Sequence, residues 1–197
     1  MNKTRSKILS LVFMAFYVAL AVVLSYINKI MPIIQMPNGG SVELMVIAIF
    51  MASYHLGWTK GVLVGILTLI INIMTGISDF WFVSFSQILL DYVLPFIVLG
   101  LASLFPNIKI GRFSFSNLYT GITVCMFMKY ASHVLAGVYF WFPEGEAAGS
   151  LAAWIYSAWT YNLGYNLATY IAAIIIVPIL VDAVLKSKTI EFIGFKK

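Results

Sequence analysis

Long apolar stretches, separated by short polar or glycine- and proline-containing breaks, dominate the pattern along the chain. Several stretches hold about 18 residues or more, enough for a helix rising about 1.5 Å per residue to cross a hydrocarbon core of roughly 30 Å. The predicted fold class is all-α integral membrane, a single domain over residues 1–197 in the plasma membrane. Its six transmembrane helices are expected near 7–29, 42–56, 60–77, 81–104, 117–141 and 151–185.

The composition agrees with a membrane protein. Hydrophobic residues make up 62% of the chain and charged residues only 10%, whereas about a quarter of the residues of a soluble protein are charged. The net charge of +5 comes from basic residues near the ends of the predicted spans, so it indicates topology and no nucleic-acid partner. The single cysteine, Cys125, lies inside a predicted span and is interpreted as a small core residue.

Basic residues set the expected orientation, because Lys and Arg concentrate on the cytoplasmic side of membrane proteins. With the N-terminus in the cytoplasm only Lys29 falls outside, and both termini lie inside. The inside set is Lys3, Arg5, Lys7, Lys60, Lys109, Arg112, Lys186, Lys188, Lys196 and Lys197. The basic start followed by Ala19-Leu20-Ala21 imitates a cleavable secretory signal. Because the apolar run continues beyond it, we expect this segment to be retained as the first span.

Three ionisable residues, Asp91, Lys129 and His133, lie within predicted spans. A charge at mid-membrane costs at least about 2.5–3.5 kcal/mol on insertion scales, so each requires a partner, a cavity or a function. Lys129 and His133 are one turn apart on one helix face. A structural ion pair between Asp91 and Lys129, or a His133 that only packs, is the alternative explanation.

The last span begins with an unusually polar and aromatic segment, comprising Trp154, Tyr156, Trp159, Tyr161, Asn162, Tyr165 and Asn166. Three helices therefore bring polar groups to the outer half of the membrane, as in a pocket open to the exterior. Pro95 cannot donate a hydrogen bond, so it leaves the Asp91 carbonyl without its helical partner. Interfacial belts explain part of the aromatic content, including Trp81 and Trp141.

A carboxylate, an imidazole and aromatic faces suit a flat, cationic ligand that donates hydrogen bonds, since aromatic rings attract a desolvated cation by about 2 kcal/mol. The outer half shows neither the arginine cluster nor the glycine-rich anion site of a phosphate ligand. Small residues at Ala15 and Ala19, and at Gly57, Gly61 and Gly65, allow close helix approach or docking of another membrane protein. Internal packing is the commoner use of such a motif.

Several segments together resemble the thiamin-specific substrate-binding subunits (S-components) of energy-coupling factor transporters. The resemblance covers nearly the whole chain, and the His133, Gly137 and Trp141 spacing within an apolar span is its most specific part. The matching segments are Met36-Pro-Asn-Gly-Gly-Ser-Val-Glu43, Ser86-Gln-Ile-Leu-Leu-Asp-Tyr92, Lys129-Tyr-Ala-Ser-His133-Val-Leu-Ala-Gly137-Val-Tyr-Phe-Trp141 and Trp154-Ile-Tyr-Ser-Ala-Trp-Thr-Tyr-Asn162.

The resemblance implies a non-enzymatic protein without cofactor or metal, whose outward pocket holds thiamin and whose outer loop 31–40 acts as a lid. It also implies a membrane coupling subunit docking near Ala15 and Ala19, and two ATPase subunits. The implied ligand-contacting residues are Asp91 and His133 as polar contacts, Tyr92, Trp141 and Tyr156 as aromatic walls, Asn162 as hydrogen-bonding partner, Gly137 as space for close approach, and Trp81 as a weaker wall.

Three departures from the family pattern bear on specificity. Asp91 stands where the family usually has Glu, Lys129 replaces an Arg, and the interval from Tyr156 to Asn162 is one residue longer, which makes Tyr161 the alternative aromatic residue. A relative of thiamin therefore remains an alternative ligand.

Two other functions compete with vitamin capture. A self-sufficient proton-coupled transporter would use Asp91 and Lys129, although such proteins normally have more helices or a repeat. An intramembrane enzyme would use Asp91 and His133 as acid and base, but the sequence lacks the familiar metalloprotease and serine hydrolase motifs.

Overall fold

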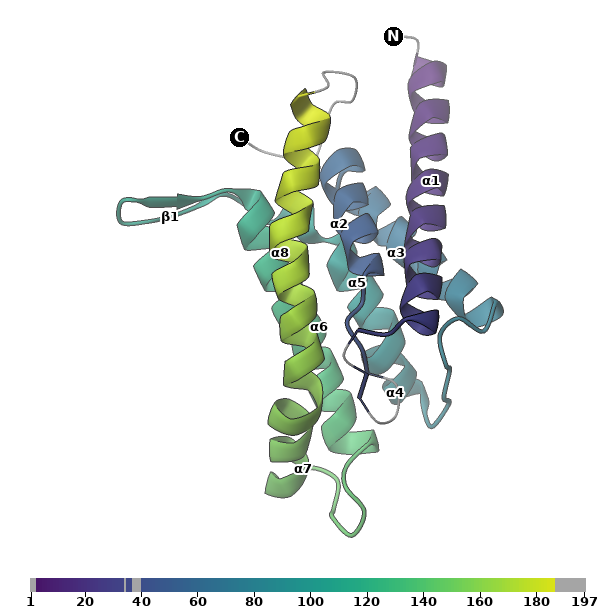
Figure 1. Cartoon of the computed structure of the whole chain (residues 1–197), viewed down its shortest axis with the longest axis vertical. Helices are drawn as coiled ribbons and strands as arrows, with labels where there is room; N and C mark the ends of the chain where they lie inside the picture. Colours follow the sequence, from purple (N-terminus) through teal and green to yellow (C-terminus); the bar gives the residue numbers. More distant parts are fainter. Residues whose placement is uncertain (1–2, 34, 37–39, 187–197) are drawn as a thin grey trace.

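The computed structural model describes residues 3–33, 35–36 and 40–186. Within these residues six helical segments form a bundle (Figure 1). The first three are α1 (Lys3–Ile30), α2 (Met45–Leu56) and α3 (Trp58–Met74). The fourth joins α4 (Phe85–Ile88), the π-helix η2 (Leu89–Val93) and α5 (Leu94–Gly100), the fifth is α6 (Asn117–Phe140), and the sixth joins α7 (Leu151–Ile155), the π-helix η4 (Tyr156–Asn162) and α8 (Leu163–Lys186). The all-α, six-span prediction is confirmed.

Two elements of the connection between α5 and α6 were not predicted. A short 3-10 helix, η3 (Ala102–Leu104), is followed by an antiparallel hairpin of β1 (Ile108–Ile110) and β2 (Phe113–Phe115). The hairpin turns at Gly111, whose φ of 57° lies in the left-handed region that glycine adopts readily. Figure 1 shows the hairpin projecting sideways from the bundle.

The spans differ in length. Three of the described helical segments, Lys7–Ile30, Asn117–Phe140 and Leu151–Lys186, are long and apolar enough to cross a membrane. The apolar helices Met45–Leu56, Trp58–Met74 and Phe85–Gly100 are shorter. The fourth begins at Phe85, later than the predicted 81, because Ser84 caps it by accepting a hydrogen bond from the Gln87 backbone N–H at 3.1 Å.

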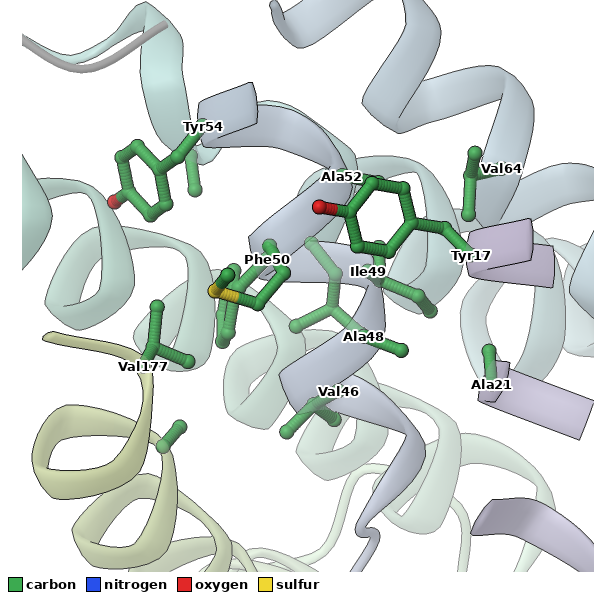
Figure 2. Packing of buried hydrophobic residues seen from close by; sticks show 14 of the residues in the cluster. Tyr17, Ala21, Val46, Ala48, Ile49, Phe50, Ala52, Tyr54, Val64 and Val177 are labelled. Atoms are coloured by element: carbon green, nitrogen blue, oxygen red, sulfur yellow. The ribbon is translucent and has the colours of Figure 1, made fainter. Parts of the chain in front are cut away.

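Helix α2 is the centre of the hydrophobic core. Its residues from Met45 to Leu56 are almost all buried, and Figure 2 shows them between α1, α3 and α8. The labelled partners include Tyr17 and Ala21 of α1, Val64 of α3 and Val177 of α8. Helix α1 therefore contributes to this core.

Glycines bring α3 against α2 and α5. A side chain on Gly61 would meet the backbone of Gly100 and Ser53, and one on Gly65 would meet the carbonyl of Phe96. The glycine seam is therefore used for internal packing, as expected. Gly57, with a φ of 88°, makes the tight turn from α2 to α3.

The start of α1 and the end of α8 lie at one end of the bundle, and α4 and α7 lie at the other (Figure 1). Because the number of spans is even, the first helix begins and the last helix ends at the same end of the bundle. The polar residues singled out in the sequence belong to segments at the second end.

Candidate ligand-binding site

One side of α6 carries Lys129, His133, Gly137 and Trp141, each four residues after the last. Four-residue spacing places side chains on one helix face, one above the other. Each of them contacts a different part of the protein, so α6 is the element that organises the site.

Asp91 lies at the outer end of this face. Its Oδ2 accepts hydrogen bonds from Gln87 Nε2 at 2.8 Å and from Trp141 Nε1 at 2.7 Å. Both donors are neutral, and among the described residues none donates to Oδ1. The carboxylate is therefore fixed in orientation while one oxygen stays available to a ligand.

The backbone around Asp91 is a π-helix, and its irregularity is stabilised by α6. Leu94 N–H bonds to the Leu89 carbonyl, five residues earlier, and Pro95 has no N–H to offer. The Leu90 carbonyl instead accepts a hydrogen bond from Ser132 Oγ at 2.6 Å. The sequence prediction assigned the missing partner to the Asp91 carbonyl, whereas in the structure it is the Leu90 carbonyl whose partner is provided by another helix.

The hydrogen bonds of His133 define its tautomer. Tyr165 OH donates to Asn162 Oδ1 at 2.6 Å, which uses its only proton. His133 Nδ1, 2.9 Å from the same hydroxyl, must then be the donor. A neutral His133 therefore keeps Nε2 as an acceptor, and among the described residues no group donates to it.

Asn162 and Gly137 hold α6 against η4. The Asn162 side-chain amide donates to the His133 carbonyl of α6 at 3.4 Å and, within η4, to the Ser157 carbonyl at 3.0 Å. A side chain on Gly137 would clash with Ser157. Both residues thus support the site indirectly. Gly137 allows α6 to approach η4 closely, and Asn162 orients Tyr165 by accepting its hydrogen bond.

The π-helix η4 coincides with the interval from Tyr156 to Asn162 in which the sequence comparison found an extra residue. A π-bulge absorbs one additional residue without disturbing the helix on either side. Tyr156 and Tyr161 both lie here, with ring centroids 6.1 Å apart. Tyr161 OH also accepts a hydrogen bond from the Gly40 N–H at 3.2 Å, so it contacts the outer loop.

Lys129 is only 1% exposed, and its ion pair differs from the one considered in the sequence analysis. Its Nζ lies 3.1 Å from Glu43 Oε1 and 3.0 Å from Asn166 Oδ1. The alternative of an Asp91–Lys129 ion pair was wrong. Lys129 pairs with Glu43, in the segment that precedes α2, and donates a hydrogen bond to Asn166 of α8. That assignment needed the position of Glu43, which sequence spacing does not give.

Tyr92 and Trp81 lie beside the loop between α3 and α4. Tyr92 OH accepts from the Trp81 backbone N–H at 3.0 Å and lies 3.2 Å from the Asp79 carbonyl. The Trp81 side chain is 65% exposed. In this structure the two residues fix the loop.

Sequence reasoning gave no individual role to several supporting residues, namely Gln87, Ser157 and Glu43, and named Tyr165 only as part of the polar start of the last span. Gln87 is four residues before Asp91 and Tyr165 three after Asn162, so helical spacing could have identified both. Of the predicted lid, residues 34 and 37–39 lie outside the described part of the chain. Within the described ranges, no group of three or more His, Cys, Asp or Glu residues could hold a metal ion.

Known proteins are similar to this chain in sequence and in fold. The model of the thiamine transporter protein family matches residues 11–189. The thiamine transporter ThiT of Bacillus subtilis is 28% identical over 188 residues, covering 91% of this chain and 93% of its own length. A solved structure of ThiT from Listeria monocytogenes superposes with a TM-score of 0.61 at 19% identity, covering 92% of this chain and 96% of that one. Because the family model spans most of the sequence, the chain belongs to the thiamine transporter protein family.

Proposed function

We propose that this chain captures thiamin at the outer side of the plasma membrane, as the substrate-binding subunit of an energy-coupling factor importer. The observation that carries the proposal is a pair of fixed, available acceptors, Asp91 Oδ1 and His133 Nε2, in a chain of this family. Both relatives described above are named ThiT, and one of them is named a thiamine transporter.

Thiamin matches this set of groups. Its aminopyrimidine ring donates hydrogen bonds, and its thiazolium ring carries a positive charge. Asp91 Oδ1 would lie near a hydrogen-bond donor of thiamin and near its positive charge. His133 Nε2 would accept a hydrogen bond from the amino group of the pyrimidine. Trp141, with Tyr156 or Tyr161, would provide aromatic faces, where a desolvated cation gains about 2 kcal/mol or more.

The remaining residues predicted to contact the ligand would act through other residues. Asn162 would orient Tyr165 and hence His133, Gly137 would keep α6 close to η4, and Tyr92 would fix the loop that carries Trp81. Asp91 is shorter than Glu by one methylene, and its fixed position would favour a ligand lying close to α4 and η2.

Free thiamin is a better match than its phosphate esters. Lys129 is already neutralised by Glu43, and Lys29 lies 3.6 Å from Asp79. No other lysine or arginine belongs to the outer connections in the predicted topology. A phosphate would therefore meet Asp91 without a compensating cation, which is unfavourable.

One alternative loses its structural basis. A proton-coupled transporter based on an Asp91–Lys129 pair lacks that pair, because Lys129 pairs with Glu43.

In the proposed importer a coupling membrane subunit and two ATPases would supply the energy. The whole chain would act as one substrate-binding domain.

Thiamin binding to purified protein, measured by calorimetry, tests the proposal. Trp141→Phe removes the donor to Asp91 and part of the ring, so we expect binding about tenfold weaker, the loss of roughly 1.4 kcal/mol. Trp58→Phe, at the opposite end of the bundle, is the matched control and should bind like the parent. Absence of thiamin binding by the folded parent protein, or equal affinities for parent and Trp141→Phe, would contradict the proposal.

A further inference from the structure

The hairpin of β1 and β2 has two chemically different faces. Its register pairs Ile108 with Phe115, Lys109 with Ser114, and Ile110 with Phe113. Directly opposed residues of an antiparallel pair point to the same side, and successive residues alternate. One face therefore carries Ile108, Ile110, Phe113 and Phe115, and the other carries Lys109 and Ser114.

The apolar face is uncovered by the described part of the chain. Phe113 is 59% exposed and Ile110 is 64% exposed, and every strand residue of the hairpin is exposed. A two-stranded hairpin is marginally stable in water unless its apolar face packs against something. The four large side chains consequently require a partner beyond the described part of the chain.

The base of the hairpin is held firmly. The Asn117 backbone N–H donates to Asn107 Oδ1 at 2.7 Å, and Thr120 Oγ1 donates to the Pro106 carbonyl at 2.7 Å. These contacts fix the direction in which the hairpin leaves the bundle. Figure 1 shows that it projects sideways, on the half of the molecule that holds the start of α1 and the end of α8.

We propose that this hairpin lies in the cytoplasmic interface of the bilayer, with its apolar face in the acyl region and its basic residues on anionic lipid headgroups. Lys109 is on the polar face and Arg112 is at the turn, and neither forms an ion pair with a described residue. Arg112 lies 5.5 Å from the centre of the Phe113 ring, so a cation and an aromatic ring occupy the tip together.

The charge of the hairpin favours lipid over other occupants. The cytoplasmic leaflet is negative and attracts basic segments near its surface. Aromatic and aliphatic residues beside Lys and Arg are the combination that binds such an interface. A sideways projection, roughly along the plane of the membrane, also presents the long side of the hairpin to lipid.

The test places an environment-sensitive NBD fluorophore on the full chain in lipid nanodiscs. In a Cys125→Ala background, the single cysteine is introduced by Phe113→Cys on the apolar face or by Ser114→Cys, its neighbour on the polar face. The nanodiscs contain phosphatidylcholine alone or mixed with phosphatidylglycerol, with or without nitroxide-labelled lipid. Thiamin binding reports whether each variant is folded.

We expect blue-shifted emission and several-fold stronger quenching by lipid nitroxide for the label at 113 than for the label at 114. Adding Lys109→Glu and Arg112→Glu should reduce the quenching at 113 in nanodiscs that contain phosphatidylglycerol. Equal access of aqueous iodide to both labels would overturn the proposal. Protection at 113 that appears only after a coupling subunit is added would overturn it too, and would identify the face as a protein contact.

Discussion

Lys129 Nζ lies 3.1 Å from Glu43 Oε1, so a cation buried in α6 joins the segment before α2 to the polar start of the last span. Asn166 Oδ1 completes this environment at 3.0 Å. Glu43 is also bonded directly to α8, because its backbone N–H donates to Thr169 Oγ1 at 3.1 Å. The ion pair thus holds the outer loop against the helices that carry His133 and Tyr165.

Removing one partner of this pair should destabilise the protein strongly. Lys129→Met leaves the Glu43 carboxylate buried without a cation, and breaking a buried pair in this way costs about 3–5 kcal/mol. Lys129→Met with Glu43→Gln should recover part of the loss. Chemical denaturation in detergent measures both. The control is Lys29→Met, which breaks an exposed pair with Asp79 and should cost at most about 1 kcal/mol; an equal cost for both lysines would contradict this account.

The tautomer of His133 predicts a difference between two substitutions. His133→Asn keeps a donor near Tyr165 but has no atom at the position of Nε2, whereas His133→Gln can present an acceptor there. A buried donor that loses its acceptor costs about 1–3 kcal/mol, so the Asn variant should bind thiamin roughly 5–150-fold more weakly. The Gln variant should lose less, as calorimetry can show. If Asn were the better replacement, the acceptor would be misassigned.

Ser132 and Pro95 are expected to be energetically coupled through the Leu90 carbonyl. Ser132→Ala leaves this buried acceptor without a donor, which costs about 1–3 kcal/mol. Pro95→Ala restores a backbone N–H to the helix, so Ser132→Ala should cost less in that background. A double-mutant cycle of unfolding free energies measures the coupling. Independent, additive effects would show that the π-helix does not depend on this hydrogen bond.

The small residues of α1 should matter for uptake but not for binding. Ala15 and Ala19 are exposed, on the side of α1 that faces away from Tyr17, Val18 and Ala21 in the core. Ala15→Trp and Ala19→Trp should therefore reduce thiamin uptake in cells that supply a coupling subunit and its ATPases, with thiamin affinity unchanged. Ala183→Trp, on an exposed position of α8, is the matched control. Normal uptake in all three variants would place the docking face elsewhere.

Much of the fold followed from local rules. Apolar run length predicted six spans, and the missing N–H of Pro95 predicted a nearby carbonyl without its helical partner, which is that of Leu90 rather than the expected Asp91. These features depend on hydrophobic burial and backbone chemistry that act within a segment of the chain. The hairpin at 108–115 was missed because its strands are only three residues long and lack a buried face to impose a pattern.

The polar partners could be decided only in three dimensions. The sequence alone established that Asp91, Lys129 and His133 needed partners, because charged and polar groups are costly in a membrane. Which partner each one has depends on how helices far apart in the sequence are rotated and how deeply they pack. Thus Lys129 meets Glu43 rather than Asp91, Trp141 meets Asp91, and the proton of Tyr165, donated to Asn162, determines which nitrogen of His133 is left to accept.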